Sequence, residues 1–294
     1  MTIVVIGKNG QLASEIDTVN KQKFNSECVF LGKEDVDLFD RTKVFKTLSD
    51  ANPVAVINAS AYTAVDAAEN DKQGANLLNH IAVKHLSEYC ANRSIHLTHV
   101  STDYVFAGDK GSPYLSSDNT EPQGEYGWSK LRGEQAVTKI NGNNSAILRT
   151  SWVYSKYGNN FVKTMLRLMQ EKPELGVIDD QIGSPTWARG LAEACLTVSE
   201  KQIKGIHHYT DSGVASWYDF AVAIQTLGND LGILSKTIPI KPIPSSAYPT
   251  PVKRPNYSVM SKLSFIACTG LQPTHWQVQL KSMLLELIQV ETNK

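Results

Sequence analysis

The sequence of 294 residues has no net charge, because 29 lysines and arginines balance 29 aspartates and glutamates. This balance argues against a broad basic surface, so we expect neither nucleic acid nor an anionic membrane as a partner. The chain also has no apolar run that approaches the ~20 residues of a membrane-spanning helix. Its first residues read as a buried strand rather than as a signal peptide, which predicts a cytoplasmic protein.

Cysteine is scarce and scattered, with four residues at positions 28, 90, 195 and 268 and no CxxC pair. Neither a disulfide framework nor a zinc ribbon fits this spacing, and free thiols in a reducing cytoplasm are the simpler expectation. The histidines at 96 and 99 and the adjacent pair at 207 and 208 do not form a zinc-binding pattern either. We therefore predict no metal site among them.

A composition of 41% hydrophobic and 20% charged residues is that of an ordinary folded protein. Short β-branched segments alternate with segments of helical period through the first half, which predicts βαβ units. The expected strands are 2–7, 28–31, 54–59, 96–101 and 146–150, and the expected helices are 11–20, 41–50, 74–92 and 129–140. This alternation predicts an α/β fold of Rossmann type, a doubly wound parallel sheet with helices on both faces.

The second half is less regular, and six prolines gather between residues 239 and 255. They favour loops that wrap a surface. Apolar residues at near-helical spacing from 276 to 290 predict a packed terminal helix. We expect a Rossmann domain over residues 1–171 and a smaller C-terminal substrate-binding lobe over 172–294, with helices that return to the first domain.

A glycine-containing turn follows the first expected strand and opens the first helix, with the sequence GKNGQLA at residues 7–13. Glycine allows the backbone to approach a pyrophosphate, whose charge is favourable at a helix N-terminus. The spacing G-x-x-G-x-x-A is also compatible with an ordinary structural turn, but its position in a βαβ unit favours a dinucleotide site. The second strand ends at Leu31-Gly32-Lys33 without an acid, so NADPH is plausible and NADH is possible. Lys33 is either a 2'-phosphate ligand or a solvated lysine.

Tyr126 and Lys130 stand four residues apart at the start of an expected helix, and residues at this spacing share one helical face. A nearby cation lowers the pKa of a phenol, which makes tyrosine a better acid–base catalyst. This predicts a depressed pKa for Tyr126. The Y-x-x-x-K pattern alone often arises by chance.

Ser101, Thr102 and Asp103 end the fourth expected strand, at the edge where doubly wound sheets bind ligands. The Thr102 hydroxyl can donate to a substrate carbonyl beside Tyr126, and Asp103 can accept hydrogen bonds from sugar hydroxyls. A strand end of this composition is also good turn chemistry. The combination with the other two motifs favours a catalytic site.

Taken with the glycine turn, further segments carry a family resemblance: NASAYTAVD at 58–66, STDYVF at 101–106, RTSWVY at 149–154, GNNF at 158–161, DQIGSPT at 180–186 and AYPTP at 247–251. Together with Tyr126-x-x-x-Lys130 they resemble the dTDP-4-dehydrorhamnose reductase family of extended short-chain dehydrogenases/reductases. The resemblance runs from the first residue to the last helix. Ser60 and Ala13 depart from the family pattern, but both are small and leave room for a cofactor.

This resemblance implies an NADPH-dependent oxidoreductase that reduces the 4-keto group of dTDP-4-dehydro-6-deoxy-L-mannose to dTDP-L-rhamnose. It implies Thr102, Tyr126 and Lys130 as the catalytic residues. The implied cofactor-binding residues are Gly7, Gly10, Gln11, Leu12, Lys33, Asp37, Leu38, Ala59, Ser60, Ala61, Tyr62, Tyr126 and Lys130. The implied substrate-binding residues are Thr63, Val65, Thr102, Asp103, Tyr126, Trp152, Asn160 and Arg254. We expect Trp152 to offer a flat apolar face to the sugar and Arg254 to clamp the diphosphate.

Two other functions compete with this interpretation. The first is another nucleotide-sugar enzyme, an epimerase or a 4,6-dehydratase, although dehydratases of this group typically carry a glutamate where this chain has Tyr104. The second is a cofactor-binding regulatory subunit without activity, which would not need Thr102, Tyr126 and Lys130.

Some members of this family form dimers with magnesium bound by clustered glutamates, and the corresponding positions here are Glu15, Arg189 and Glu286. Magnesium needs oxygen ligands, whereas the Arg189 guanidinium can neutralise either glutamate directly. We therefore predict no metal requirement at this position and a possible homodimer held by ion pairing. The alternative is that all three are solvated residues on a monomer.

Overall fold

The computed structural model of the chain describes residues 2–292, with side-chain surroundings described up to residue 289. A six-stranded sheet forms its centre, with strand order β10-β5-β4-β3-β1-β2 and all neighbours parallel. Its strands are β1 (Thr2–Ile6), β2 (Glu27–Leu31), β3 (Ala55–Asn58), β4 (His96–Thr102), β5 (Ser145–Thr150) and β10 (Gly205–His208). The predicted parallel α/β sheet is confirmed, and the five strands expected in the first half all form.

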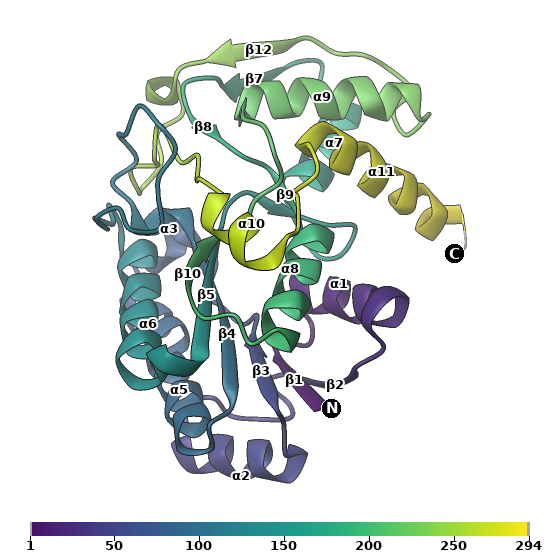
Figure 1. Ribbon diagram of the computed structural model, residues 1–294. Helices are drawn as coiled ribbons and strands as arrows, with labels where there is room; N and C mark the ends of the chain where they lie inside the picture. Colours follow the sequence, from purple (N-terminus) through teal and green to yellow (C-terminus); the bar gives the residue numbers. More distant parts are fainter. Residues whose placement is uncertain (1, 293–294) are drawn as a thin grey trace.

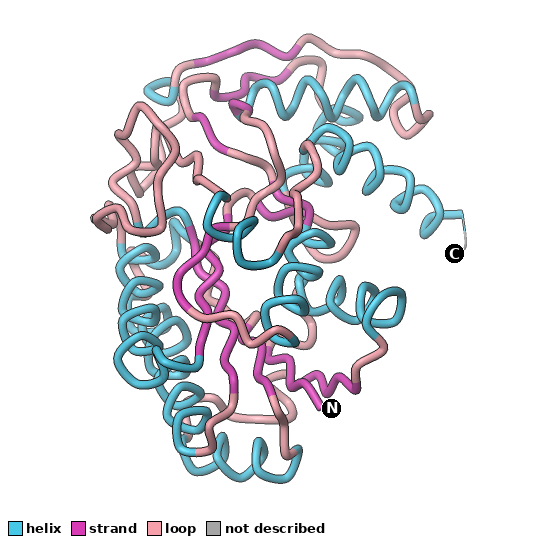
Figure 2. The backbone as a smooth tube through the Cα atoms, viewed as in Figure 1, coloured by secondary structure: helices cyan, strands magenta, loops and turns pink. Residues whose placement is uncertain are grey.

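Helices cover both faces of this sheet, as Figures 1 and 2 show. The helices of the chain are α1 (Gln11–Val19), α2 (Arg41–Ala51), α3 (Val65–Ala68), α4 (Lys72–Asn76), α5 (Ala82–Asn92), α6 (Glu125–Asn141), α7 (Phe161–Glu171), α8 (Ala188–Glu200), α9 (Trp217–Asp230), α10 (Leu263–Thr269) and α11 (Trp276–Thr292). A π-helical segment, Leu77–Ile81, joins α4 to α5, so the expected helix over 74–92 is one helical stretch with a bulge. Within the described part of the chain, no helix has the length and apolarity needed to cross a membrane.

The alternation of side chains along β1 explains the layering. Ile3 and Val5 pack into one buried cluster with residues of α1 and α8, whereas Val4 and Ile6 pack into a second with residues of α2, α5 and α6. Successive side chains of a strand point to opposite faces, so a continuous apolar run such as this one needs cover on both sides.

The chain reverses its direction of winding between β1 and β3. From β1 it moves outward to β2, then returns to β3 on the other side and continues to β4 and β5. In sheets of this kind a crevice opens at the carboxyl ends of the two strands that flank the reversal. The residues that follow β1, β3 and β4 are therefore brought to one edge.

A second core lies beyond this edge, in the upper part of Figure 1, and is built from α7, α9 and α11 with short strands. The short strands are β6 (Val153–Tyr154), β7 (Leu175–Ile178), β8 (Ile182–Gly183), β9 (Thr186–Trp187), β11 (Ala215–Ser216) and β12 (Ile240–Ile243). Helix α7 packs into this second core, although the expected boundary at residue 171 assigned it to the first domain. Helix α8 and strand β10 return to the central sheet, and we expected the helices but not the strand.

Candidate active site

The turn after β1 leaves backbone amides free at the start of α1. Gly7 has φ of +106°, and a Cβ there would lie 3.0 to 3.1 Å from backbone atoms of Ala59 and Ser60. Gly10 is the extended N-cap residue of α1, and no side chain caps it. The free amides and the positive end of the helix dipole therefore face the crevice, which is a binding site for an anionic group.

Thr102, Tyr126 and Lys130 meet on the opposite side of the same crevice. Thr102 ends β4, while Tyr126 lies in the first turn of α6 and Lys130 one turn later; all three are buried. The expected helix over 129–140 begins four residues earlier than predicted, at Glu125, which places both Tyr126 and Lys130 on helical backbone. The Thr102 hydroxyl donates to Asp103 Oδ1 at 3.0 Å.

Burial dominates the ionisation of these groups. It raises the pKa of Tyr126, and contact with the Thr102 hydroxyl offsets this only in part. It lowers the pKa of Lys130 to about 8 against the opposing effect of the Glu134 carboxylate. The prediction of a depressed Tyr126 pKa is therefore wrong, because the effect of desolvation on this pKa outweighs that of any nearby cation. The Lys130 ammonium instead donates to the backbone oxygen of Val100 at 2.7 Å.

Asp103 is also buried, and burial raises its pKa to about 6, partly offset by the hydrogen bond from Thr102 and the nearby hydroxyl of Ser258. Its Oδ2 is buried without a hydrogen-bond partner. A carboxylate with a free buried oxygen at a strand end is suited to accept a ligand hydroxyl. The protonated phenol and the Thr102 hydroxyl together suit hydrogen bonding and proton donation to a carbonyl oxygen, while the free oxygen of Asp103 suits a hydroxyl group of the same ligand.

These groups share a cleft of about 820 Å³. Most of the residues predicted for the site line it: Gly7, Gly10, Gln11, Leu12, Lys33, Ala59, Ser60, Ala61, Thr63, Val65, Thr102, Asp103, Tyr126, Lys130 and Trp152. The cleft thus runs from the start of α1 past the end of β3 to Tyr126, a size and shape that suit a dinucleotide and a second ligand.

Three residues predicted to touch the cofactor lie outside the lining of this cleft. Asp37 is exposed and accepts from Lys43 at 3.3 Å, and the backbone oxygen of Leu38 contacts His85 at 3.0 Å. The backbone of Tyr62 is bonded in both directions by Asn79, at 2.9 and 3.0 Å. Asn79 is a buried residue that we did not predict, and it holds the segment after β3 in place.

Two residues predicted to touch the substrate stand beside the cleft. Asn160 caps α7 and donates to the side chain of Gln11 at 2.9 Å. Arg254 pairs with Asp66 at 2.7 Å and lies 3.5 Å from the hydroxyl of Tyr104, which itself lines the cleft. Arg254 is therefore paired with a carboxylate of its own chain and stands outside the cleft lining.

An acid at the end of β2 was missed in the sequence. Glu34 folds back so that its carboxylate would lie 2.7 Å from a Cβ on Gly32, and it accepts from Asn9 at 3.3 Å. Lys8 lies between Glu34 and Asp35, at 3.8 and 3.2 Å. The sequence GKED at 32–35 contains this acid, three residues after the last residue of the strand, whereas our prediction considered only residues 31–33.

Trp152 lines the cleft, and the prediction that it offers a flat face to the sugar stays a prediction. Its indole stacks on Trp217 with ring centroids 3.5 Å apart and 9° between the planes. A Cβ on Gly183 would lie 2.7 Å from indole Cε2 and 2.9 Å from Cζ2 and Nε1. These distances place Gly183 over the ring, on the face opposite Trp217, because the two cannot share one face.

Arg189 joins Glu15 to Glu286, at 2.6 Å to the first and 2.7 and 2.8 Å to the second. Lys156 also pairs with Glu286 at 2.8 Å, and Glu15 is fully buried. The predicted ion pairing of Arg189 is confirmed within the chain, and Glu15 is not a solvated residue. Among the described residues, no cluster of three or more His, Cys, Asp or Glu side chains could hold a metal ion.

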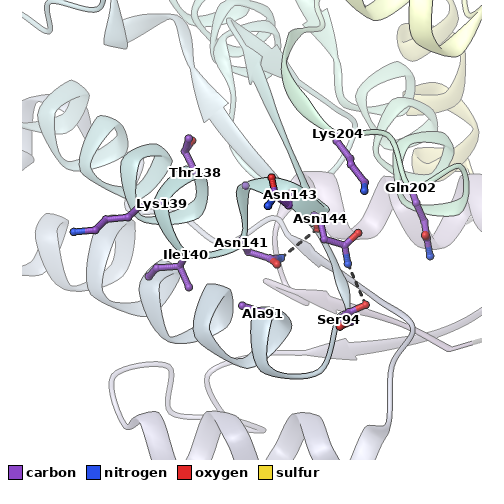
Figure 3. Close-up of a pocket in the computed structure, with 11 residues that line it drawn as sticks. Ala91, Ser94, Thr138, Lys139, Ile140, Asn141, Asn143, Asn144, Gln202 and Lys204 are labelled. Carbon is purple, nitrogen blue, oxygen red and sulfur yellow. Dashed lines mark hydrogen bonds between the residues drawn. The ribbon is translucent and has the colours of Figure 1, made fainter.

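A second hollow of about 570 Å³ lies where α6 ends, near the segments that lead into β4 and β10 (Figure 3). Its amides bond to nearby backbone: Asn141 donates to the oxygen of Asn144 at 3.2 Å and Asn144 to that of Ser94 at 3.0 Å. It contains no pair of acidic and basic catalytic groups, so we assign no chemistry to it.

A Rossmann sheet whose cleft holds a threonine, a tyrosine and a lysine in this arrangement defines a short-chain dehydrogenase/reductase. The family model described as the RmlD substrate binding domain matches residues 1–289. The chain belongs to this family.

Relatives of known name agree with this assignment. A dTDP-4-dehydrorhamnose reductase of Sinorhizobium fredii is 37% identical over 295 residues, which cover 98% of each chain. The crystal structure of a dTDP-4-dehydrorhamnose reductase from Clostridium acetobutylicum has a TM-score of 0.92 at 37% identity and covers 98% of this chain and 100% of that one. A Bacillus anthracis dTDP-4-dehydrorhamnose reductase, solved in complex with NADP, has a TM-score of 0.90 at 32% identity, with 97% and 99% covered.

Proposed function

We propose that this chain reduces the 4-keto group of dTDP-4-dehydro-6-deoxy-L-mannose to give dTDP-L-rhamnose, with NADPH as the reductant. The observation that carries the proposal is the single cleft that joins the free amides of α1 to Thr102, Tyr126 and Lys130. The similarity to named reductases over the whole chain supports the choice of substrate.

The cleft fits the cofactor at its phosphate end. Gly7 and Gly10 leave the space that a Cβ would fill, and the amides of Gln11 and Leu12 at the start of α1 can hold the pyrophosphate. The small residues Ala59, Ser60 and Ala61 leave room for the ribose and nicotinamide. When bound, NADPH supplies the hydride that adds to C4 of the sugar.

Tyr126 supplies the proton in this mechanism. Its raised pKa keeps the phenol protonated at neutral pH, as a proton donor to the oxygen at C4 must be. The Thr102 hydroxyl turns from Asp103 to the carbonyl oxygen and polarises it. Lys130 turns from Val100 toward the cofactor ribose, and its charge stabilises the phenolate that remains.

The sugar nucleotide is held by residues that follow β3 and by Asp103 just after the end of β4. Thr63 and Val65 follow β3, and the free oxygen of Asp103 accepts a sugar hydroxyl. Asn160 and Arg254 stand beside the cleft, and Arg254 exchanges Asp66 for the diphosphate when the substrate enters.

The activity should depend on pH through two groups. Lys130, with a pKa of about 8, is charged below that value and neutral above it, and Asp103, with a pKa of about 6, is charged above that value and neutral below it. We therefore expect kcat/KM to be highest between these values and to fall about tenfold per pH unit outside them. Initial rates across this range, with circular dichroism to verify folding at each pH, test this. A profile that stays flat through both values would contradict the assignment.

Cofactor preference should depend on the charges at the end of β2. Lys33 is exposed and lines the cleft, so Lys33→Ala should weaken NADPH binding by up to about fivefold and leave NADH unchanged. Glu34→Gln removes the carboxylate over Gly32 and should strengthen NADPH binding by a similar factor. Fluorescence titration with each cofactor measures both changes, and Lys46→Ala, an exposed lysine on α2, is the control. Equal NADPH affinity in wild type and both variants would exclude these residues from discrimination.

The Glu15, Arg189 and Glu286 cluster should make magnesium unnecessary. Arg189 pairs with both carboxylates, Lys156 also pairs with Glu286, and Ser155 and Trp187 donate to the other oxygen of Glu15. Hydrogen bonds and ion pairs within the chain therefore already serve the carboxylates that a divalent cation would need. We expect the rate and the sedimentation mass to be the same with EDTA and with excess magnesium. A mass or rate that rises with magnesium would contradict this.

The proposed reaction is tested by following NADPH absorbance on addition of dTDP-4-dehydro-6-deoxy-L-mannose. We expect NADPH to be consumed in proportion to the substrate added. A flat trace with folded protein and verified substrate would remove the reductase assignment and favour a regulatory, cofactor-binding role.

A further inference from the structure

The indole of Trp152 packs between two residues that do not themselves line the cleft. Gly183 comes from β8 and Trp217 from the first turn of α9, and neither belongs to the cleft wall. The two come from one unit, because Gly183 pairs with Ala215 in β11, which leads directly into α9. The capping box of Ser216 and Asp219 fixes the start of that helix, and so the position of Trp217.

The backbone of Trp152 is strained and held in place. Its φ of +49° lies in the left-handed region, which a bulky side chain rarely adopts. Its neighbours hold it there: the Ser151 hydroxyl donates to the oxygen of Ser184 at 2.9 Å, and the Thr186 amide donates to the oxygen of Trp152 at 3.2 Å. Strain of this kind persists only where the surroundings impose it, and it concentrates at ligand sites.

With Trp217 stacked on one face and Gly183 against part of the other, the ring edge is the part of Trp152 that these two residues leave open. That edge carries the Nε1–H donor. Among the described residues this donor has no hydrogen-bond partner, and it is not buried. Buried indole N–H groups elsewhere in the chain are used: Trp187 donates to Glu15 and Trp276 to the backbone of Val214. Trp152 therefore lines the cleft and carries a solvent-accessible donor without a protein partner.

We propose that Gly183 and Trp217 are positioning residues that hold Trp152 edge-on to the cleft, so that its Nε1–H donates a hydrogen bond to an oxygen of the sugar. The inference rests on the proposed function, since the sugar must lie beside Trp152. It links substrate recognition to the second core, because Trp217 packs on Phe161 in α7, with ring centroids 4.7 Å apart.

Variants of the residues on the two faces of the indole test whether they position Trp152. Trp217→Leu removes the stack, and Gly183→Ala places a methyl group against the other face. Each should lower kcat/KM for the sugar nucleotide by about tenfold or more, mainly through KM, with NADPH affinity within about twofold. Trp217→Phe should restore much of the loss. Tyr218→Leu, the next residue of α9, is the control and should leave the KM unchanged.

A spectroscopic readout separates positioning from general damage. Two stacked indoles give an exciton couplet in the circular dichroism spectrum, which we expect in the wild type and expect to lose in Trp217→Leu but not in Tyr218→Leu. If Trp217→Leu loses the couplet and melts earlier but keeps the wild-type KM, Trp217 is only structural and the proposal is overturned.

Trp152→Phe tests the edge directly, because it keeps an aromatic ring but removes the N–H. We expect KM for the sugar nucleotide to rise about tenfold, as for the loss of one hydrogen bond to a ligand. A KM within about twofold of wild type would overturn the donor role. These comparisons require an active wild type, so a wild type without reductase activity would instead refute the proposed function.

Discussion

Replacing Tyr126 with phenylalanine should lower kcat by about 10²–10⁴, the contribution of one positioned acid–base group. The ring would still pack against Tyr104, with which Tyr126 makes an edge contact at 5.5 Å between centroids, so the fold and the cofactor affinity should be retained. The measurement is steady-state turnover, together with fluorescence titration of NADPH.

Tyr104→Phe is the matched control, since Tyr104 lines the same cleft and burial raises its pKa as well. We expect it to cost less than about tenfold, because its hydroxyl contacts Arg254 rather than Thr102. If Tyr126→Phe kept about half of the activity, or if Tyr104→Phe were the more damaging change, Tyr126 would not be the proton donor.

The largest effect on stability is expected at a buried ion pair behind the site. Both oxygens of Glu134 accept from Arg149, at 2.9 and 2.7 Å, and each side chain is only 3% exposed. Glu134→Gln leaves the guanidinium without its countercharge and should lower the free energy of unfolding by about 3–5 kcal/mol. Urea denaturation followed by circular dichroism measures the loss.

Glu171→Gln provides the surface control, because its pair with Arg167 is about half exposed at both ends and should contribute only about 0–1 kcal/mol. The buried variant has a second readout. The Glu134 carboxylate raises the pKa of Lys130, so its loss should move the alkaline fall in activity to lower pH. Equal stability losses in the two variants would refute the special role of the buried pair.

The first half of the fold was predictable because each strand is a short apolar run followed by a helix with a clear period. Helix α8 is buried on nearly all sides, at residues such as Leu191, Ala194, Cys195 and Val198, because it packs against both the sheet and α1. Helix α9 carried a signal that we did not use, the capping box of Ser216 and Asp219. Strand β10 is four residues long and pairs with β5, a long-range contact that local pattern does not reveal.

The site residues were recognisable where chemistry follows from residue type and spacing, as for Thr102, Tyr126 and Lys130. What the sequence could not show depends on three-dimensional surroundings. The ionisation of Tyr126 is set by burial, and the indole of Trp152 is stacked on Trp217 with Gly183 close to its other face. Arg254 is paired with Asp66, 188 positions away in the chain.

Transfer of a labelled hydride tests the central claim most directly. NADPH that carries two deuterium atoms at the reactive carbon of its nicotinamide would be incubated with the enzyme and dTDP-4-dehydro-6-deoxy-L-mannose, and the product examined by mass spectrometry and proton NMR. The mechanism predicts dTDP-L-rhamnose with one deuterium at C4 and none elsewhere. Unlabelled product, deuterium at another carbon, or recovery of unchanged substrate from folded enzyme would contradict it.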